Sequence, residues 1–210
     1  MSSLSAAPEA VAPVSGRIGP NAIIRVAEVL PQRVGTRVTA SLFESAGLAH
    51  YLREPPRAMV DEAEVLRLHE VLRRELGWPL AREVSREAGR RTGEYLLAHR
   101  IPSLVQVLLK GLPAALAARV LLKAITRHAW TFAGSGAFTA QPGTPVRLKI
   151  QRNPMCRGVQ ADAPACDFYT ATFERLFREL VHPHSRVVET SCEAVGADAC
   201  RFEIRWDRPC

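Results

Sequence analysis

The chain has 210 residues, of which 47% are hydrophobic and 23% charged, so it can bury a core without disulfide bonds. This composition excludes a disordered protein, a disulfide-dense mini-protein and a collagen-like chain. The net charge of +7 comes largely from arginines spread along the chain rather than gathered with stacking aromatics, so we expect no nucleic-acid partner.

Residues 1–16 are rich in Ala, Pro and Ser and predict a disordered arm. They contain neither the basic start nor the continuous apolar segment of a secretory signal, so we predict a cytoplasmic protein with reduced thiols. We interpret residues 17–210 as a single ligand-binding domain, helical over 17–127 and β-rich over 128–206. These two halves around one core predict an α+β fold.

In the helical half, apolar spacing predicts a helix over residues 21–30 that Pro31 stops, and a second helix over 36–52. Residue 61 begins a stronger helix, for which Gly77 is the expected end. The next helix starts near Pro79 and runs to about residue 98.

Gly89 and Gly93 lie four residues apart inside this last helix, where each costs about 1 kcal/mol relative to alanine. Such glycines indicate that something approaches the backbone closely. Two readings stay open, tight packing of another helix or a flat ligand lying in the groove.

The most apolar stretch, residues 101–125, is interrupted by Lys110, Arg119 and Lys123 and broken at Gly111 to Pro113. These interruptions predict two shorter helices in place of a membrane-spanning one. We interpret them as core helices, as the wall of an apolar ligand pocket, or as a surface with at most peripheral membrane contact.

After residue 127 the pattern changes. Trp130, Phe132 and Phe138 flank Gly134-Ser135-Gly136 and, with the alternating residues 146–150, predict strands. A helix is expected over residues 162–180. Two further strands, over 187–193 and 200–206, are joined by a turn.

All five cysteines lie at or after Cys156. The hairpin turn brings Cys192 and Cys200 together, Glu189 lies three residues before Cys192, and Cys166 precedes the neighbouring helix. Three thiolates and a carboxylate form a closed tetrahedral site, so we predict a structural metal such as zinc. Cys156 competes for the fourth place, buried core thiols are the alternative, and Cys210 is expected to play no part.

The segment from Glu189 to Phe202, with the preceding Cys166 to Tyr169, resembles the signature of the 4-vinyl reductase domain family. The resemblance implies an antiparallel sheet flanked by helices, a fold related to haem nitric-oxide-sensing domains and vesicle-tethering subunits, and often a homodimer. It also implies zinc ligands at Cys166, Glu189, Cys192 and Cys200. Residues 16–206 are similar to family members from bacteriochlorophyll biosynthesis.

The family name implies reduction of the C8-vinyl group of a divinyl chlorophyllide precursor, which needs an electron donor. The sequence contains no G-x-G-x-x-G motif, no iron–sulfur spacing and no flavin signature, so no NAD or flavin cofactor is expected and no catalytic residue is identified. We therefore favour a tetrapyrrole carrier that delivers protoporphyrin or a magnesium porphyrin to magnesium chelatase or a later enzyme. The alternative is a 4-vinyl reductase that uses an external reductant.

The predicted tetrapyrrole pocket lies between the glycine-containing helix, the helices of residues 104–125 and the sheet. Arg100, Arg119 and Arg127 are candidates for binding propionates, and the two histidines of the pocket could ligate a central metal. The same residue types also occur as solvated arginines and structural histidines. The pocket residues are Gly89, Gly93, Tyr95, His99, Leu108, His128 and Trp130.

Overall fold

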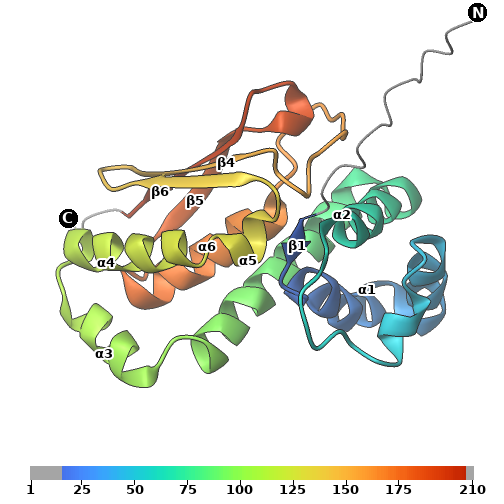
Figure 1. Cartoon of the computed structure of the whole chain (residues 1–210), viewed down its shortest axis with the longest axis horizontal. Helices are drawn as coiled ribbons and strands as arrows, with labels where there is room; N and C mark the ends of the chain where they lie inside the picture. The colour runs from blue at the N-terminus through green and yellow to red at the C-terminus, as the bar shows by residue number, and fades with distance from the viewer. Residues whose placement is uncertain (1–15, 207–210) are drawn as a thin grey trace, which may run out of the picture.

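A four-stranded antiparallel sheet forms one side of the molecule (Figure 1). The structure is a computed structural model that describes residues 16–206, so nearly all of the expected N-terminal arm and Cys210 lie outside it. The strands are ordered β3-β4-β6-β5. They are β3 (Ala137–Gln141), β4 (Val146–Gln151), β5 (Arg186–Ser191) and β6 (Cys200–Arg205).

The two central strands of this sheet present apolar side chains to one face. Leu148 lies opposite Phe202, and Val146 lies opposite Ile204. All four are buried, whereas Arg147 between them is exposed and pairs with Glu203 on the outer face. The alternation predicted from the sequence therefore gives one core face and one charged face.

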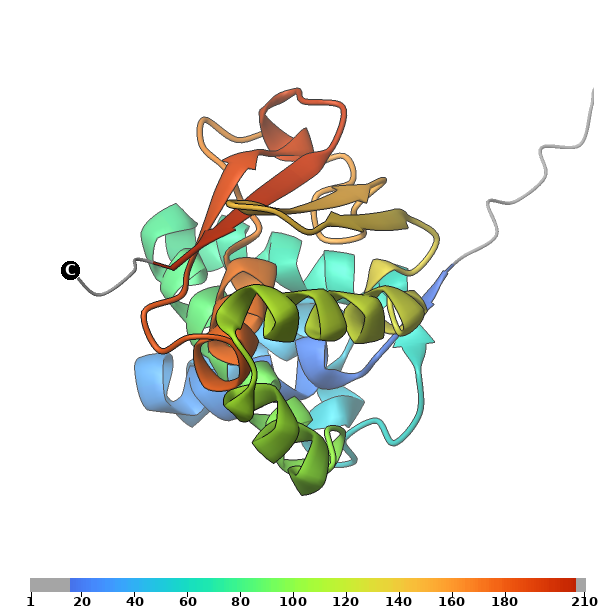
Figure 2. The same ribbon diagram turned by 90° about the vertical axis from the view of Figure 1, so that its left-hand side faces the viewer.

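Helices form two layers beneath the inner face of the sheet (Figures 1 and 2). Helix α6 (Asp167–Leu180) and helix α4 (Ala114–Arg127) lie against the sheet. Helices α1 (Asn21–Ser45) and α2 (Glu62–His99) pack on the other side of α6. A single buried apolar cluster runs through these layers, from Ile18 in the helical half to Ile204 in the sheet.

Glycines, rather than prolines, set the breaks in the two long helices. Helix α1 continues through Pro31 and leaves helical geometry at Gly35, where φ is +79°, so the predicted stop at Pro31 is wrong. Proline at that position needs no helical N–H, and the left-handed conformation that breaks the helix is one that glycine adopts readily. The predicted end at Gly77 is confirmed as a break inside α2, with φ of +73°.

Several boundaries differ from the sequence expectation. Residues 49–52 form a short 3-10 turn instead of extending α1, and α6 begins at Asp167 instead of residue 162. Trp130 and Phe132 lie in the one-turn helix α5 (Trp130–Ala133), so the predicted strand there is wrong. The remaining elements are a short pair of strands, β1 (Arg17–Ile18) with β2 (Val60–Asp61), the 3-10 turn η2 (Glu193–Val195), and helix α3 (Ser103–Gly111).

The apolar stretch after α2 forms two helices, α3 and α4, separated at Leu112 and Pro113, as predicted. Within the described residues, none of the helices is both long and apolar enough to cross a lipid bilayer.

Candidate metal centre and ligand-binding region

A β-bulge in β5 directs two metal-ligand candidates to the same face of the sheet. Glu189 pairs with Phe202, whereas Ser191 pairs with Arg201, so β5 contains one extra residue between them. Residues three apart in a regular strand point to opposite faces. The extra residue reverses that alternation, and the completely buried Cys192 therefore faces inward as Phe202 does.

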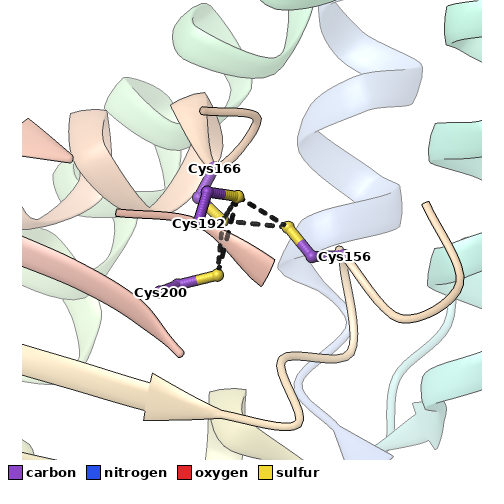
Figure 3. A group of neighbouring side chains, drawn as sticks. All are labelled: Cys156, Cys166, Cys192 and Cys200. Atoms are coloured by element: carbon purple, nitrogen blue, oxygen red, sulfur yellow. Dashed lines mark hydrogen bonds between the residues drawn. The ribbon is translucent and has the colours of Figure 1, made fainter. Parts of the chain in front are cut away.

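Four buried cysteines converge at this point (Figure 3). Cys156 comes from the loop after β4, Cys166 immediately precedes α6, Cys192 follows β5 and Cys200 begins β6. Their sulfurs all lie within 4.8 Å of one another. Segments far apart in the sequence are thus brought to a single point between the sheet and the helices.

The distances between the sulfurs fit a tetrahedral metal. Cys166 Sγ lies 3.1 Å from Cys156 Sγ, 3.4 Å from Cys200 Sγ and 3.9 Å from Cys192 Sγ. Cys192 Sγ lies 3.6 Å from Cys156 Sγ and 3.7 Å from Cys200 Sγ. Four thiolates at about 2.3 Å from one zinc ion would be separated by about 3.8 Å. The four buried cysteines could therefore hold a metal ion.

Glu189 contacts the cluster in a different way. Its Oε2 accepts a hydrogen bond of 2.8 Å from the backbone N–H of Cys166, while its Oε1 is buried without a hydrogen-bond partner. Burial and the neighbouring Cys192 raise the pKa of this carboxyl to about 9. The structure thus places Cys156 among the sulfurs and Glu189 beside them, and both ligand sets considered from the sequence stay open.

Hydrogen-bond donors surround the sulfurs as they do in metal–thiolate sites. The buried Asn153 side chain donates to Cys166 Sγ over 3.2 Å. The backbone N–H groups of Ala165 and Glu193 donate to Cys192 and Cys200, each over 3.5 Å. Donors of this kind orient ligands and stabilise thiolate charge.

The cluster is electrostatically uneven. Burial, together with hydrogen bonds to the other thiols, raises the pKa of Cys166 well above its ordinary value. Hydrogen bonds from Cys156, Cys166 and Cys200 lower the pKa of Cys192, which is the thiolate of the group. A ready thiolate and surrounding thiols that release protons on metal binding are what a metal site requires.

Arg73 of α2 is a partner of the cluster that the sequence reasoning missed. Its guanidinium lies over the Trp78 ring at 5.5 Å, and its Nη2 is buried without a hydrogen-bond partner. Burial lowers its pKa, while attraction to Cys156 and Glu70 opposes that shift. A buried cation suits a metal bound by four thiolates, which would carry a net negative charge. Only the folded helix pair brings residues so distant in sequence together.

Two further carboxylates fix the segments that carry the cysteines. Asp167 of α6, which is buried, pairs with Arg82 at 2.9 Å and Arg86 at 2.6 Å on α2. Glu193 accepts hydrogen bonds from the backbone N–H groups of Arg152 and Asn153. The metal centre would therefore clamp parts that are already held in register.

Helix α6 fills the groove beside Gly89 and Gly93. A Cβ on Gly89 would lie 2.9 Å from the carbonyl carbon of Phe168 and closer still to its oxygen, and one on Gly93 would lie 2.7 Å from the Cβ of Arg175. The close approach to these glycines is thus a helix contact, which is the packing alternative. A flat ligand at these glycines would require α2 and α6 to separate.

The other predicted pocket residues are dispersed. Tyr95 is half-buried, with its ring 4.8 Å from that of His99 and covered by Arg25 at 5.0 Å. Leu108, His128 and Trp130 are exposed. In the described part of the chain, the clearest hollows are two shallow grooves of about 300 and 340 Å³ on the outer face of the sheet, and no predicted pocket residue lines them.

Aromatic residues form a layer between α6, α5 and the sheet. The Phe173 ring lies 5.7 Å from Phe202, 5.9 Å from Phe132 and 6.3 Å from a stacked Tyr169. Phe138 of β3 contacts Phe132 at 5.2 Å, and both are only half-buried. The inward apolar spacing of α6 indicated Phe173 in the sequence, but the pairing with Phe132 depends on the turn that was mistaken for a strand.

The Gly134-Ser135-Gly136 turn has a structural role. The buried carboxylate of Glu62 accepts hydrogen bonds from the Ser135 N–H and hydroxyl, and it pairs with Arg157 at 2.7 Å. A Cβ on Gly134 would overlap the Glu62 carboxylate. The glycines therefore admit a carboxylate that joins the start of α2 to the cysteine-bearing loop.

The sequence comparisons match most of the chain to named proteins. A family model for the 4-vinyl reductase domain matches residues 146–206. The chain is 46% identical over 191 residues to the bacteriochlorophyll synthase 23 kDa chain of Cereibacter sphaeroides, covering 91% of each protein. It is 38% identical over 188 residues to the protein of that name from Rhodobacter capsulatus, covering 90% of this chain and 86% of the relative.

Solved structures match the fold. The Fe(II) unliganded H-NOX protein from K. algicida superimposes with a TM-score of 0.62 at 10% identity, covering 91% of this chain and 98% of that one. A structure that probes the function of heme distortion in the H-NOX family gives 0.54 at 15% identity, covering 92% and 97%. The expected relation to haem nitric-oxide-sensing folds is confirmed.

Proposed function

Because the chain belongs to the family of the 23 kDa bacteriochlorophyll synthase chains and carries a 4-vinyl reductase domain, we propose that it binds a tetrapyrrole intermediate of bacteriochlorophyll synthesis and delivers it to a biosynthetic enzyme. The observation that carries this proposal is the match of 46% identity over 91% of both chains. The name of that relative gives the pathway, and the proposed ligand class is a protoporphyrin or magnesium porphyrin.

The fold supports a flat aromatic ligand. A structure of the same fold is the subject of work on heme distortion, so this arrangement of helices and sheet accommodates a tetrapyrrole in at least one other protein. Fold likeness alone does not transfer a ligand, so the support is for the class of ligand and not for its identity.

We place the tetrapyrrole between α4 and the sheet, beside the aromatic layer. The inner side of α4 carries small and aliphatic residues such as Ala117, Ala118 and Leu121, all buried. Phe132 and Phe138, opposite, remain half-buried, so their faces are accessible to a ring that lifts α4. This placement keeps the part of the predicted pocket that α6 leaves free.

The metal at the four cysteines would be zinc in a structural role. Four sulfur ligands leave no open coordination position, so this ion would hold α6, the loop after β4 and the β5–β6 hairpin together rather than act on substrate. The proposal separates the two sites, with the metal centre stabilising the fold and the aromatic layer binding the pigment.

Titration of the purified protein with protoporphyrin and with magnesium protoporphyrin, followed by absorbance, tests the binding site. We expect saturation near one pigment per chain, with binding weakened about three- to ten-fold by Phe132→Leu or Phe138→Leu. The matched control is Phe43→Leu, the same change at a buried residue of α1 far from the layer. Equal weakening by all three variants would contradict the placement.

Incubation with a divinyl chlorophyllide precursor and NADPH, followed by pigment analysis, tests the reductase alternative. We expect the substrate to bind and to be recovered unchanged. Formation of the reduced pigment by the purified protein would contradict a pure carrier. A mass measurement on the same sample reports the oligomeric state, for which the family resemblance favours a homodimer.

A further inference from the structure

Helix α3 presents aliphatic side chains to solvent. Leu104 is 78% exposed, Val107 69% and Leu108 68%, whereas Leu109 is buried. The Gln106 side chain donates hydrogen bonds to the carbonyls of Leu97 and Ile101. The helix is thus fixed to the end of α2 with its apolar side turned outward, which is unusual for a surface helix.

Helix α4 continues this surface with an exposed stripe in which apolar and basic residues alternate. Leu116 and Val120 are each 44% exposed, and Arg119, Lys123 and Arg127 are exposed beside them at helical spacing. The opposite side of the helix is buried. Figure 2 shows α3 and α4 together on the side of the molecule that faces the viewer.

The charge of this surface has a single sign. Residues 95–161 contain nine Lys and Arg and no Asp or Glu. In the described structure Arg119, Lys123 and Arg127 have no carboxylate partner. The nearby Glu179 of α6 is paired with Lys110. Exposed aliphatic residues combined with unpaired cations are typical of an interfacial helix on anionic lipid.

We propose that the outer face of α3 and α4 docks on an anionic lipid bilayer surface, with the aliphatic residues of α3 entering the interface and the three cations of α4 contacting lipid headgroups. The charge argues against a second copy as the occupant. A symmetric dimer through this face would bring two sets of like charges together without an acidic residue to pair with them. The inference is independent of the tetrapyrrole proposal.

Sedimentation of the pigment-free protein with lipid vesicles tests the docking. We expect strong binding to vesicles of equimolar phosphatidylglycerol and phosphatidylcholine, weaker binding at raised salt, and little binding to pure phosphatidylcholine. Because no pigment is present, this result does not depend on tetrapyrrole binding. Equal binding to the two vesicle types, or none to either, would overturn the proposal.

Charge reversal identifies the face. Each basic residue near an anionic surface contributes about five-fold to partitioning, so Arg119→Glu, Lys123→Glu and Arg127→Glu together should lower it at least about 100-fold. The matched control reverses three exposed arginines of the helical half without ion-pair partners in the described structure. These are Arg37, Arg53 and Arg57.

Leu104→Ser with Leu108→Ser tests the apolar contribution separately, and we expect about a ten-fold loss that persists at raised salt. Circular dichroism should be unchanged, because both side chains are exposed. If the control triple weakens vesicle binding as much as the α4 triple, or if the leucine pair changes the oligomeric state but not vesicle binding, the surface is not a lipid-docking face.

Discussion

The backbone carbonyl of Phe168 in α6 lies against the α-carbon of Gly89 in α2, with no side chain between the two helices. The Thr172 hydroxyl donates a hydrogen bond of 3.0 Å to the Gly89 carbonyl at the same contact. This approach sets the position of α6, and α6 in turn positions Cys166 at its start and Phe173 in the aromatic layer. Both candidate sites thus depend on one glycine.

Gly89→Ala should therefore destabilise the protein, although alanine favours a helix by about 1 kcal/mol. The new methyl group would overlap the backbone of Phe168, which cannot move as a flexible side chain can, so we expect a net loss of about 2 kcal/mol or more in the free energy of unfolding. Urea denaturation measures it. Gly111→Ala in α3, where a Cβ meets nothing within 4 Å, is the control and should be neutral or stabilising. Equal effects of the two substitutions would contradict the helix contact.

The ligand set of the metal centre can be decided by two substitutions. Because Cys156 Sγ lies 3.1 Å from Cys166 Sγ, we expect Cys156→Ser to lower zinc affinity more than ten-fold. Glu189→Gln, which keeps the acceptor for the Cys166 N–H, should retain the metal at close to wild-type content. Elemental analysis after dialysis against a chelator gives the metal per chain, with Cys210→Ser as the control. Zinc loss in Glu189→Gln but not in Cys156→Ser would favour the three-cysteine, one-glutamate set.

The acid sensitivity of the fold should depend on His69. Burial, with a contribution from Arg73, lowers the pKa of this imidazole to about 3 from its ordinary 6.5, and the residue is 2% exposed. The unfolded chain takes up a proton below about pH 6.5 that the folded protein excludes, so stability falls as the pH is lowered toward 3. Between about pH 7 and 5 the wild type should lose about 2 kcal/mol more than His69→Leu. Parallel urea-denaturation stabilities for the two proteins would show that His69 is not the group responsible.

Much of this architecture follows from local patterns. The alternation of Val146, Leu148 and Ile150 predicts a strand with one buried face, and the break at Gly77 follows from the conformational freedom of glycine. The three cysteines Cys166, Cys192 and Cys200 could be brought together in prediction because a hairpin joins two of them.

Other features depend on contacts between segments distant in sequence. The bulge in β5 and the entry of Cys156 into the cluster are set by the loop that Glu193 and Asn153 hold, and no local spacing encodes that loop. The predicted pocket failed to assemble for a similar reason. Gly89 marks a close approach, but the sequence does not say whether a ligand or α6 makes it.

The most direct test of the proposed function is gel filtration of the purified protein mixed with excess protoporphyrin. The account predicts that pigment co-elutes with the protein at close to one per chain, with an absorption band shifted from that of free pigment. Elution of all the pigment in the free fraction at micromolar concentrations, from protein that is folded and carries its metal, would contradict tetrapyrrole binding.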